Sequence, residues 1–174
     1  AIHVHLGSAG KTVEPYIEAL EKTLELVDLL RSDGFRIEAL DMGGGYGAAY
    51  ETGTAPAAAQ YAEAIVGMVK GKDLKLILEP GASIAANAGI MVSRVLYKKK
   101  GGEKKFVIVD AGMNDLIRPP LYGAFHFIWP VEVDDKFMPG KRRKDMSAEV
   151  DGTEVVDVVG PICEGSDFLA QGRS

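Results

Sequence analysis

Side chains able to bind or react follow three apolar segments in the first half of the chain. The segments end in His3-Val4-His5-Leu6-Gly7-Ser8, in Asp41-Met42-Gly43-Gly44-Gly45 and in Glu79-Pro80-Gly81. If each segment is a strand of a parallel sheet, the three motifs lie at the carboxyl ends of the strands, where ligands of such folds bind. We therefore expect the motifs to converge on one ligand.

The triplet Gly43–Gly45 indicates what that ligand is. Consecutive glycines let backbone N–H groups approach an anion without interference from a Cβ atom. Ser8 would add a hydroxyl donor, so the pattern predicts a bound phosphate. The alternative is a tight turn, which needs only one or two glycines. A dinucleotide-binding pattern, G-x-G-x-x-A, also matches here, but residues 50–55 intervene before the next helix, which disfavours it.

Three titratable side chains accompany these motifs. Glu79 ends an apolar strand, so we expect it to be buried and paired with a lysine, an arginine or a cationic ring nitrogen of a cofactor. His3 and His5 alternate along a strand, and we expect them to face opposite sides, so that only one points inward. A purely structural histidine is the alternative.

The second half of the chain carries a further set of polar residues. Arg118 and Tyr122 are close enough in sequence to clamp a carboxylate. Cys163, the single cysteine, lies in a loop rich in proline, glycine and acidic residues, which favours a role in a site. The alternative is a small buried hydrophobic residue.

The elements that position these residues change in character near residue 85. Before it, apolar periodicity predicts strands and helices in alternation, β-α-β-α-β, at 2–6, 15–32, 36–42, 56–69 and 74–78. After it, strands are predicted at 89–97, 105–110, 125–133 and 154–159, with a hairpin turn at 98–104. The sequence thus predicts an α/β domain at 1–85 and an all-β domain at 86–174.

Composition excludes several classes of protein. The 174 residues are 47% hydrophobic and 26% charged, values of a globular chain rather than a disordered or collagen-like one. No apolar run approaches the roughly 18 residues of a membrane span. A net charge of −5 disfavours nucleic acid as a partner. One cysteine allows no internal disulfide and fits a reducing, cytoplasmic location. We predict no metal site.

Taken together, five motifs resemble those of the diaminopimelate decarboxylases, which are pyridoxal-phosphate-dependent decarboxylases of fold type III. In order they are H-x-G-S, D-x-G-G-G, E-P-G, D-A-G-M-N-D-L-I-R-P-x-L-Y and G-P-I-C-E-x-x-D, and the resemblance covers residues 2–173. It implies the conversion of meso-diaminopimelate to L-lysine and carbon dioxide by a cytoplasmic homodimer with sites at the subunit interface. It also implies the last part of a (β/α)8 barrel followed by most of a β-sandwich or β-barrel domain.

The resemblance also implies roles for individual residues. His5 would stack on the pyridine ring of the cofactor, and Glu79 would pair with the ring nitrogen. The phosphate would be held by Ser8 and Gly43–Gly45, and Gly81 would belong to the same cofactor-binding set.

The same resemblance covers the second half of the chain. Cys163, reaching the site of the partner subunit, would protonate the α carbon after carbon dioxide leaves. Arg118 and Tyr122 would bind a substrate carboxylate, and Glu164 would bind the distal ammonium group.

The chain also departs from the family pattern. Ala82 stands where the family has arginine after E-P-G, and C-E-G-S-D replaces the usual C-E-S-x-D. The family's cofactor-binding lysine lies upstream of H-x-G-S, and its late tyrosine would lie beyond Ser174. We therefore expect a piece of a longer enzyme that is poorly folded and inactive alone. The alternatives are an ornithine- or arginine-type decarboxylase and a non-catalytic homologue that only binds ligands.

Overall fold

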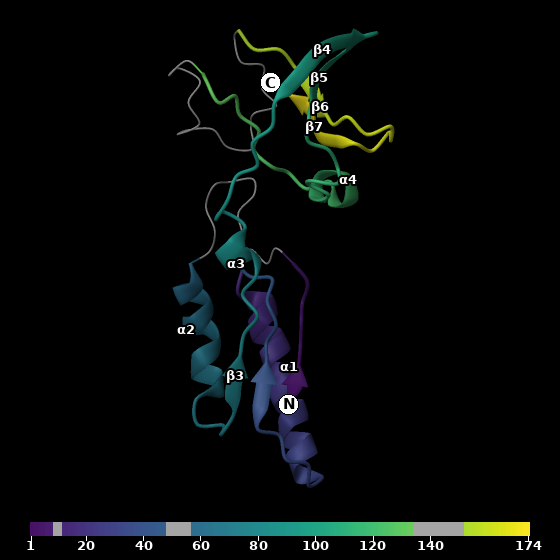
Figure 1. Ribbon diagram of the computed structural model, residues 1–174. Coiled ribbons are helices and arrows are strands. Elements are labelled where there is room, and N and C mark those ends of the chain that lie inside the picture. The colour runs from purple at the N-terminus through teal and green to yellow at the C-terminus, as the bar shows by residue number, and fades with distance from the viewer. Residues whose placement is uncertain (9–11, 48–56, 134–151) are drawn as a thin grey trace. The chain divides into compact units, whose positions relative to one another are not determined.

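The computed structural model describes residues 1–8, 12–47, 57–133 and 152–174, which form two compact units. The first unit ends at Ile90 and the second begins at Met91 (Figure 1). The elements of the first unit are β1 (Ile2–His3), α1 (Glu14–Ser32), β2 (Ala39–Asp41), α2 (Ala58–Val69), β3 (Lys75–Ile77) and α3 (Ala82–Ala85). Those of the second are β4 (Val95–Gly101), β5 (Lys104–Val109), α4 (Arg118–Tyr122), β6 (Val156–Val159) and β7 (Phe168–Arg173).

The long helix α1 matches its prediction because its sequence carries start, stop and packing signals. Pro15 lies in the first turn, where a missing N–H costs nothing. Gly34 follows the last turn with φ at +89°, a conformation that glycine adopts without strain. The buried positions of the helix recur at steps of three and four residues and are Tyr16, Leu20, Thr23, Leu24 and Val27.

The strands β1, β2 and β3 pair in parallel in that order. Two rows of paired residues run across this sheet, and successive residues of a strand face opposite sides. One row consists of Ile2, Leu40 and Leu76 and packs against the helices; the other consists of His3, Asp41 and Ile77 and faces away. The sheet therefore separates a core face from a polar face.

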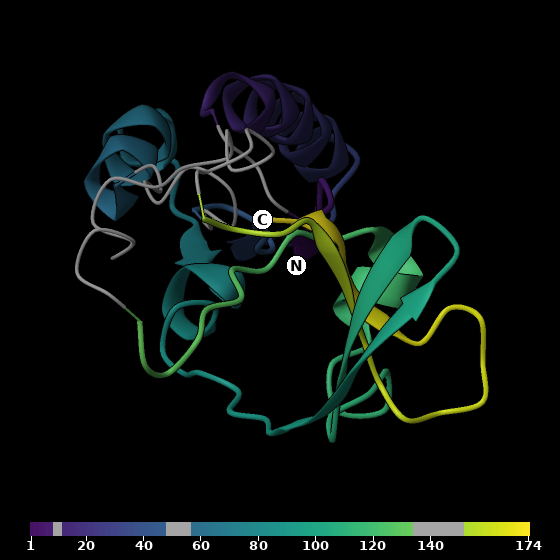
Figure 2. The same ribbon diagram turned by 90° about the horizontal axis from the view of Figure 1, so that it is seen from above.

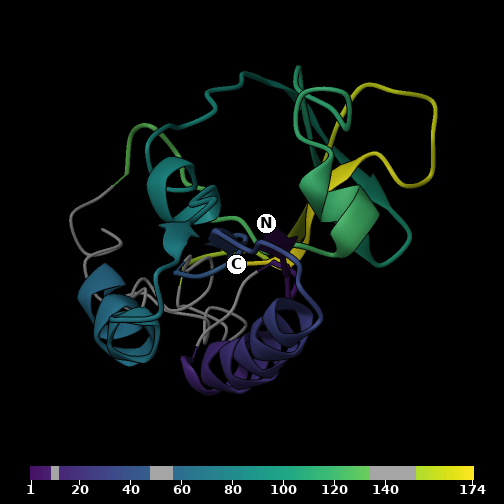
Figure 3. The ribbon, with the colours of Figure 1, turned by 90° about the horizontal axis from the view of Figure 1, so that it is seen from below.

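Both long helices cover the same face of this sheet. Leu40 and Met42, on the core face of the sheet, belong to one hydrophobic core with Leu20 of α1 and Ile65 of α2. All four residues are fully buried. Figure 2 and Figure 3 show α1 and α2 together on one side of the strands. A dinucleotide-binding fold instead has helices on both faces, and its glycine turn opens directly into a helix. Here α2 begins at Ala58, well after Gly45.

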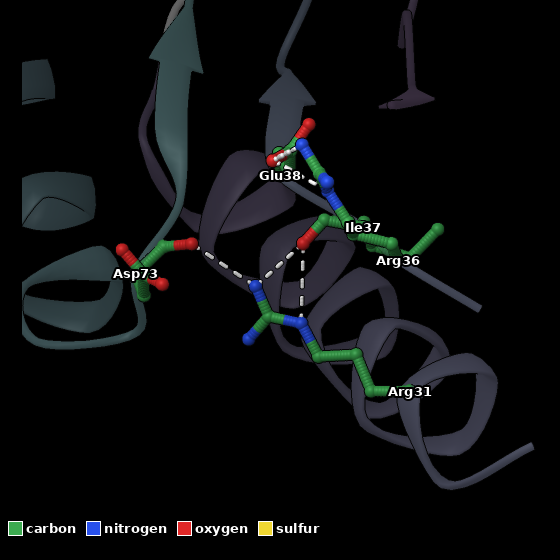
Figure 4. A network of polar contacts seen from close by, with 5 residues as sticks. All are labelled: Arg31, Arg36, Ile37, Glu38 and Asp73. Atoms are coloured by element: carbon green, nitrogen blue, oxygen red, sulfur yellow. Dashed lines mark hydrogen bonds and ion pairs between the residues drawn. The ribbon is translucent and has the colours of Figure 1, made fainter. Parts of the chain in front are cut away.

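The ends of the strands opposite the glycine motifs are joined by a single side chain, Arg31 of α1 (Figure 4). Its guanidinium group donates two hydrogen bonds to the carbonyl oxygen of Ile37, at 3.2 and 2.6 Å. It donates two more to the carbonyl oxygens of Lys72 and Asp73, at 2.9 and 3.0 Å. Arg31 thus connects the end of α1 to the segments that lead into β2 and β3.

The second unit is a mixed four-stranded sheet in the order β4-β5-β6-β7. β4 and β5 form a hairpin as predicted, with Gly102 at φ +63° in its turn, but residues 98–101, expected in the turn, belong to β4. β5 and β6 pair in parallel, and β6 and β7 pair in antiparallel fashion. A small core of Val109, Ala111, Val158, Leu169 and Ala170 lies on this sheet.

Two strand predictions for the second half need correction. Residues 125–133 form no strand; instead Phe125 packs at right angles on Phe127 and under the guanidinium group of Arg173, and Pro130 has no N–H to donate. The strand expected at 89–97 lies at Val95–Gly101, where β5 provides its partner. Three elements were not predicted: the short helix α3 of the first unit, and the helix α4 and strand β7 of the second.

Candidate functional site

The three motifs of the first unit lie side by side at the carboxyl ends of the parallel strands. Backbone hydrogen bonds extend the sheet past the strand ends. Val4 N–H donates to the Asp41 carbonyl oxygen at 2.9 Å, and Glu79 N–H donates to the Gly43 carbonyl oxygen at 2.8 Å. The residues after β1, β2 and β3 are therefore neighbours, as the sequence predicts.

The glycine triplet is needed first of all for close packing. A Cβ atom on Gly44 would collide with the carbonyl oxygen of Glu79, and one on Gly45 would collide with that of Gly7. A Cβ atom on Gly43 would lie 2.6 Å from the Val4 carbonyl oxygen and 2.8 Å from Nδ1 of His5. The three strand ends approach so closely that no side chain fits between them.

Two N–H groups of the triplet already have acceptors within the chain. Gly43 N–H donates to Oδ1 of Asp41 at 2.9 Å, and Gly44 N–H donates to Nδ1 of His5 at 3.2 Å. The second bond makes Nδ1 of His5 the acceptor nitrogen of its ring, which leaves Nε2 to carry the proton of the neutral imidazole. Gly45 lies beside Ser8, whose Cα would be 3.3 Å from a Cβ atom on Gly45.

A second feature of this rim is a group of two carboxylates and a histidine. Nε2 of His3 lies 3.6 Å from Oε2 of Glu79, and one ligand atom each of His3, Asp41 and Glu79 lies within 4.8 Å of the others. The side chain of Glu79 is 52% exposed, so the expectation that it is buried was wrong. Glu79 follows the end of β3 and faces away from the helical core, which explains its exposure.

The expectation that His3 and His5 face opposite sides was also wrong. Val4 between them packs against the helical core, whereas His3 contacts Glu79 and His5 contacts Gly44. Residues two apart in an extended segment share a face, so both histidines lie on the polar side of the sheet. His3 and Asp41 thus belong to the candidate site. The alternation of side chains along each strand, with a period of two residues, is the sequence signal that could have identified both.

The segment after Glu79 turns at once into a short helix. Gly81 precedes α3, and its carbonyl oxygen accepts the N–H groups of Ile84 and Ala85. Nothing lies within 4 Å of the position of a Cβ atom on Gly81. Ala82, at the arginine position of the family pattern, is the first residue of α3 and is half-buried.

In the second unit, Arg118 and Tyr122 lie one turn apart on α4. The guanidinium carbon of Arg118 is 5.8 Å from the centre of the Tyr122 ring, so the two side chains share one side of the helix. Burial, together with the charge of Arg118, lowers the pKa of His126 below its ordinary value. The positive charge of Arg118 thus disfavours a second positive charge on His126.

Cys163 and Glu164 lie in the loop between β6 and β7. Cys163 is exposed, which rules out the alternative of a buried hydrophobic residue. Oε1 of Glu164 accepts the N–H and the hydroxyl of Ser166, at 3.2 and 3.1 Å, within the same loop. The loop is anchored by Asp167, a residue to which the sequence motif assigned no role.

Comparison with known proteins identifies the class to which these features belong. The family model described as "Pyridoxal-dependent decarboxylase, C-terminal sheet domain" matches residues 16–174. The chain therefore belongs to the family of pyridoxal-dependent decarboxylases.

Individual members of that family show how similar the chain is to particular enzymes. The diaminopimelate decarboxylase of Aquifex aeolicus is 45% identical over 173 residues, which are 99% of this chain and 38% of that protein. The crystal structure of diaminopimelate decarboxylase from Helicobacter pylori complexed with L-lysine has a TM-score of 0.80 at 38% identity, covering 98% of this chain and 38% of that one. A lysine/ornithine decarboxylase from Vibrio vulnificus, complexed with putrescine, shares the fold at a TM-score of 0.75, over 97% of this chain and 42% of that one, but only 19% identity. The resemblance inferred from the sequence is confirmed, and the chain spans about two fifths of the length of these relatives.

Among the described residues, no helix is both long and apolar enough to cross a membrane.

Proposed function

We propose that the whole protein to which this sequence belongs decarboxylates meso-diaminopimelate to L-lysine with the help of pyridoxal phosphate. The observation that carries the proposal is the 45% identity to a diaminopimelate decarboxylase over 99% of this chain. The matched region spans Asp110–Pro119, the stretch whose sequence pattern points to diaminopimelate rather than ornithine. The lysine/ornithine decarboxylase, at 19% identity, supports the fold and not that substrate.

We further propose that the unit ending at Ile90 is the last part of a (β/α)8 barrel. Its parallel order β1-β2-β3, with each strand beside its predecessor and both long helices on one face, is the arrangement of such a barrel. The polar face of the sheet would then be the inner face, and the glycine motifs would lie at the catalytic rim. The four-stranded sheet of the second unit would then belong to the family's C-terminal sheet domain.

The residues of the first unit suit pyridoxal phosphate by their chemistry. Glu79 and Asp41 bring two carboxylates to one place, which favours the protonated form of a ring nitrogen. His5 is held at Nδ1 by Gly44, so that its ring has a fixed edge and a free face for stacking. Ser8 and Gly43–Gly45 would hold the phosphate. We expect the N–H group of Gly45 to contribute most to phosphate binding, because the N–H groups of Gly43 and Gly44 donate to Asp41 and His5. Gly81 would be a further residue that binds the cofactor.

The cofactor, when bound, accepts the electron pair that remains after carbon dioxide departs. Cys163 is exposed, and we assign to its Sγ the proton that goes to the substrate's α carbon. Arg118 and Tyr122 would bind a substrate carboxylate from one side of α4. Glu164, oriented by its bonds to Ser166, would bind the distal ammonium group.

The test is the production of carbon dioxide and L-lysine from meso-diaminopimelate by the whole protein loaded with pyridoxal phosphate. We expect turnover on this substrate and none on ornithine or arginine. Cys163→Ser should lower turnover by at least about a hundredfold, because a hydroxyl is a far weaker acid than a thiol. Turnover of ornithine alone would overturn the substrate assignment.

One departure from the family pattern, Ala82, supports a non-catalytic homologue as the competing function. An arginine at this position would add charge and up to five donors that a methyl group lacks. Binding of pyridoxal phosphate without turnover of any amino acid would favour this homologue. The homodimer and the cytoplasmic location stay predictions.

A further inference from the structure

Asp167 is the most deeply buried carboxylate of the described residues and lies between two loops of the second unit. Only 4% of the surface of Asp167 is exposed. Oδ1 accepts the N–H of Met113 at 2.6 Å, and Oδ2 accepts the N–H of Ile162 at 2.7 Å. Its own carbonyl oxygen accepts the N–H of Gly160 at 3.0 Å. One residue therefore satisfies backbone donors from both loops.

Two glycines make room for this carboxylate. A Cβ atom on Gly160 would lie 2.6 Å from the Cα of Gly112 and would collide with the carboxylate of Asp167. A Cβ atom on Gly112 would lie 3.0 Å from Oδ1 of Asp167. The backbones of the two loops thus touch each other at the glycines, and the carboxylate closes the contact.

The two loops carry the proposed substrate-binding and proton-donating residues. The loop from Gly160 to Asp167 holds Cys163 and Glu164, and it is closed by Asp167 N–H donating to the Glu164 carbonyl oxygen at 3.0 Å. The turn at Gly112 and Met113 leads within a few residues into α4, which begins with Arg118. Asp167 is the point at which these two segments are held together.

We propose that Asp167 is a positioning residue that sets the conformation of the Cys163–Glu164 loop relative to the segment leading into α4. The inference rests on the proposed function for the roles of Cys163 and Glu164, but the loop geometry is independent of it. A carboxylate is suited to this place because both of its oxygens accept, and it faces two donors. An asparagine has nearly the same volume but would turn an NH2 group toward one of the two N–H groups.

The test compares Asp167→Asn with Asp157→Asn in the whole protein. Asp157 is a matched control, since it is also buried, at 9% exposure, on the same sheet. Its Oδ1 accepts the N–H of Gly172 at 2.8 Å, and its Oδ2 lies 3.2 Å from Nζ of Lys104. It touches neither of the two loops by these bonds. Amide hydrogen exchange, turnover and the midpoint of thermal unfolding are measured for both variants.

We expect Asp167→Asn to speed amide exchange at Met113 and Ile162 and through the Cys163–Glu164 segment by at least about tenfold. We expect kcat to fall by about tenfold to a hundredfold with little change in affinity for pyridoxal phosphate, because a displacement of about 1 Å suffices for such a loss. Asp157→Asn should leave the exchange of these amides unchanged and alter kcat less than twofold. This should hold even if it lowers the unfolding midpoint as much as Asp167→Asn does.

Two outcomes would overturn the inference. Unchanged exchange of the loop amides in Asp167→Asn would show that the carboxylate does not order the loop. Equal loss of kcat in both variants would show that Asp167 acts through stability alone. If the unsubstituted protein does not decarboxylate diaminopimelate, the proposed function fails, and the exchange measurement decides about Asp167 by itself.

Discussion

At the scale of single residues, the glycine triplet shows how packing and chemistry compete for the same positions. The motif predicts backbone N–H groups free to bind an anion, and this expectation rests on the small size of glycine. The structure gives the small size a second use, because neighbouring strand ends fill the space of each missing Cβ atom. A sequence reveals that side chains are absent but not which backbone atoms approach in their place.

The first prediction concerns Gly44. Gly44→Ala should destabilise the protein by about 2 kcal/mol, because the added Cβ atom collides with the Glu79 carbonyl oxygen, which is backbone and cannot rotate away. Gly67→Ala is the matched control. Gly67 lies in α2 with nothing within 4 Å of its Cβ position, so alanine should stabilise the helix by about 0.5–1 kcal/mol. Urea unfolding of both variants measures the difference, and equal stability of the two would contradict the packing argument.

The second prediction concerns the buried ring of Tyr61. Burial raises its pKa to about 12 from the ordinary 10.0, with smaller contributions from Tyr16 and Tyr46. The unfolded chain therefore ionises this phenol at a lower pH than the folded protein does. The phenol's contribution to folding is fully present below pH 10 and is lost as the pH rises toward 12.

Tyr61→Phe should accordingly show a shallower loss of stability between pH 10 and 12 than the unsubstituted protein. The free energy of unfolding, measured by denaturant titration at several pH values in this range, tests it. Parallel curves for the two proteins would mean that Tyr61 ionises with equal ease in both states.

At the scale of secondary-structure elements, the Arg31 side chain holds the end of α1 to the segments that lead into β2 and β3. Arg31→Lys should cost about 2 kcal/mol, because a single ammonium group cannot reach the three carbonyl oxygens that the planar guanidinium group serves. Arg36→Lys is the control seen beside it in Figure 4, since Arg36 is exposed and bonds only to Glu38 there. It should change stability by less than about 0.5 kcal/mol. Equal losses of stability in the two variants, measured by thermal unfolding, would contradict the proposed role of the Arg31 hydrogen bonds.

The elements that could be predicted are those whose signals are local. The helix α1 combines an early proline, a repeating apolar stripe and a glycine after its end, and it lies within one residue of its expected range. The hairpin of β4 and β5 follows from a glycine pair between apolar runs. By contrast, residues 125–133 have an apolar pattern suited to a strand but pair with no strand of the described residues, and strand pairing depends on distant residues.

The candidate site was predictable to a similar extent. The convergence of the motifs at His5, Gly43–Gly45 and Glu79 follows from strand order, which the β-α-β-α-β pattern fixes. The exposure of Glu79 and the hydrogen bonds of Asp167 do not follow, because each depends on where the next segment turns.

At the scale of the whole molecule, the sheet of the first unit is covered on one face only within the described residues. Parallel sheets normally have both faces buried, and three strands cannot close a barrel of about eight. Large apolar side chains of this unit are also exposed, including Ile84 at 69% and Ile90 at 91%. We expect the 174-residue chain, expressed alone, to be poorly folded and inactive.

Circular dichroism in the near and far ultraviolet during heating measures this expectation. The chain alone should lose signal gradually, whereas the whole protein should unfold in a sharp transition. A single cooperative transition of the chain, shifted upward by pyridoxal phosphate, would contradict it.

The two rows of the parallel sheet have a genetic consequence. Even-numbered residues at the strand ends, such as Leu40 and Met42, pack against the helices, and odd-numbered ones, such as Asp41 and Gly43, lie on the polar side. Loss of a single codon just before residue 40 would shift the parity of the motif that follows and send the carboxylate of Asp41 into the helical core. Such an in-frame deletion should thus be more damaging than the loss of two adjacent codons, which would keep each side chain on its own face.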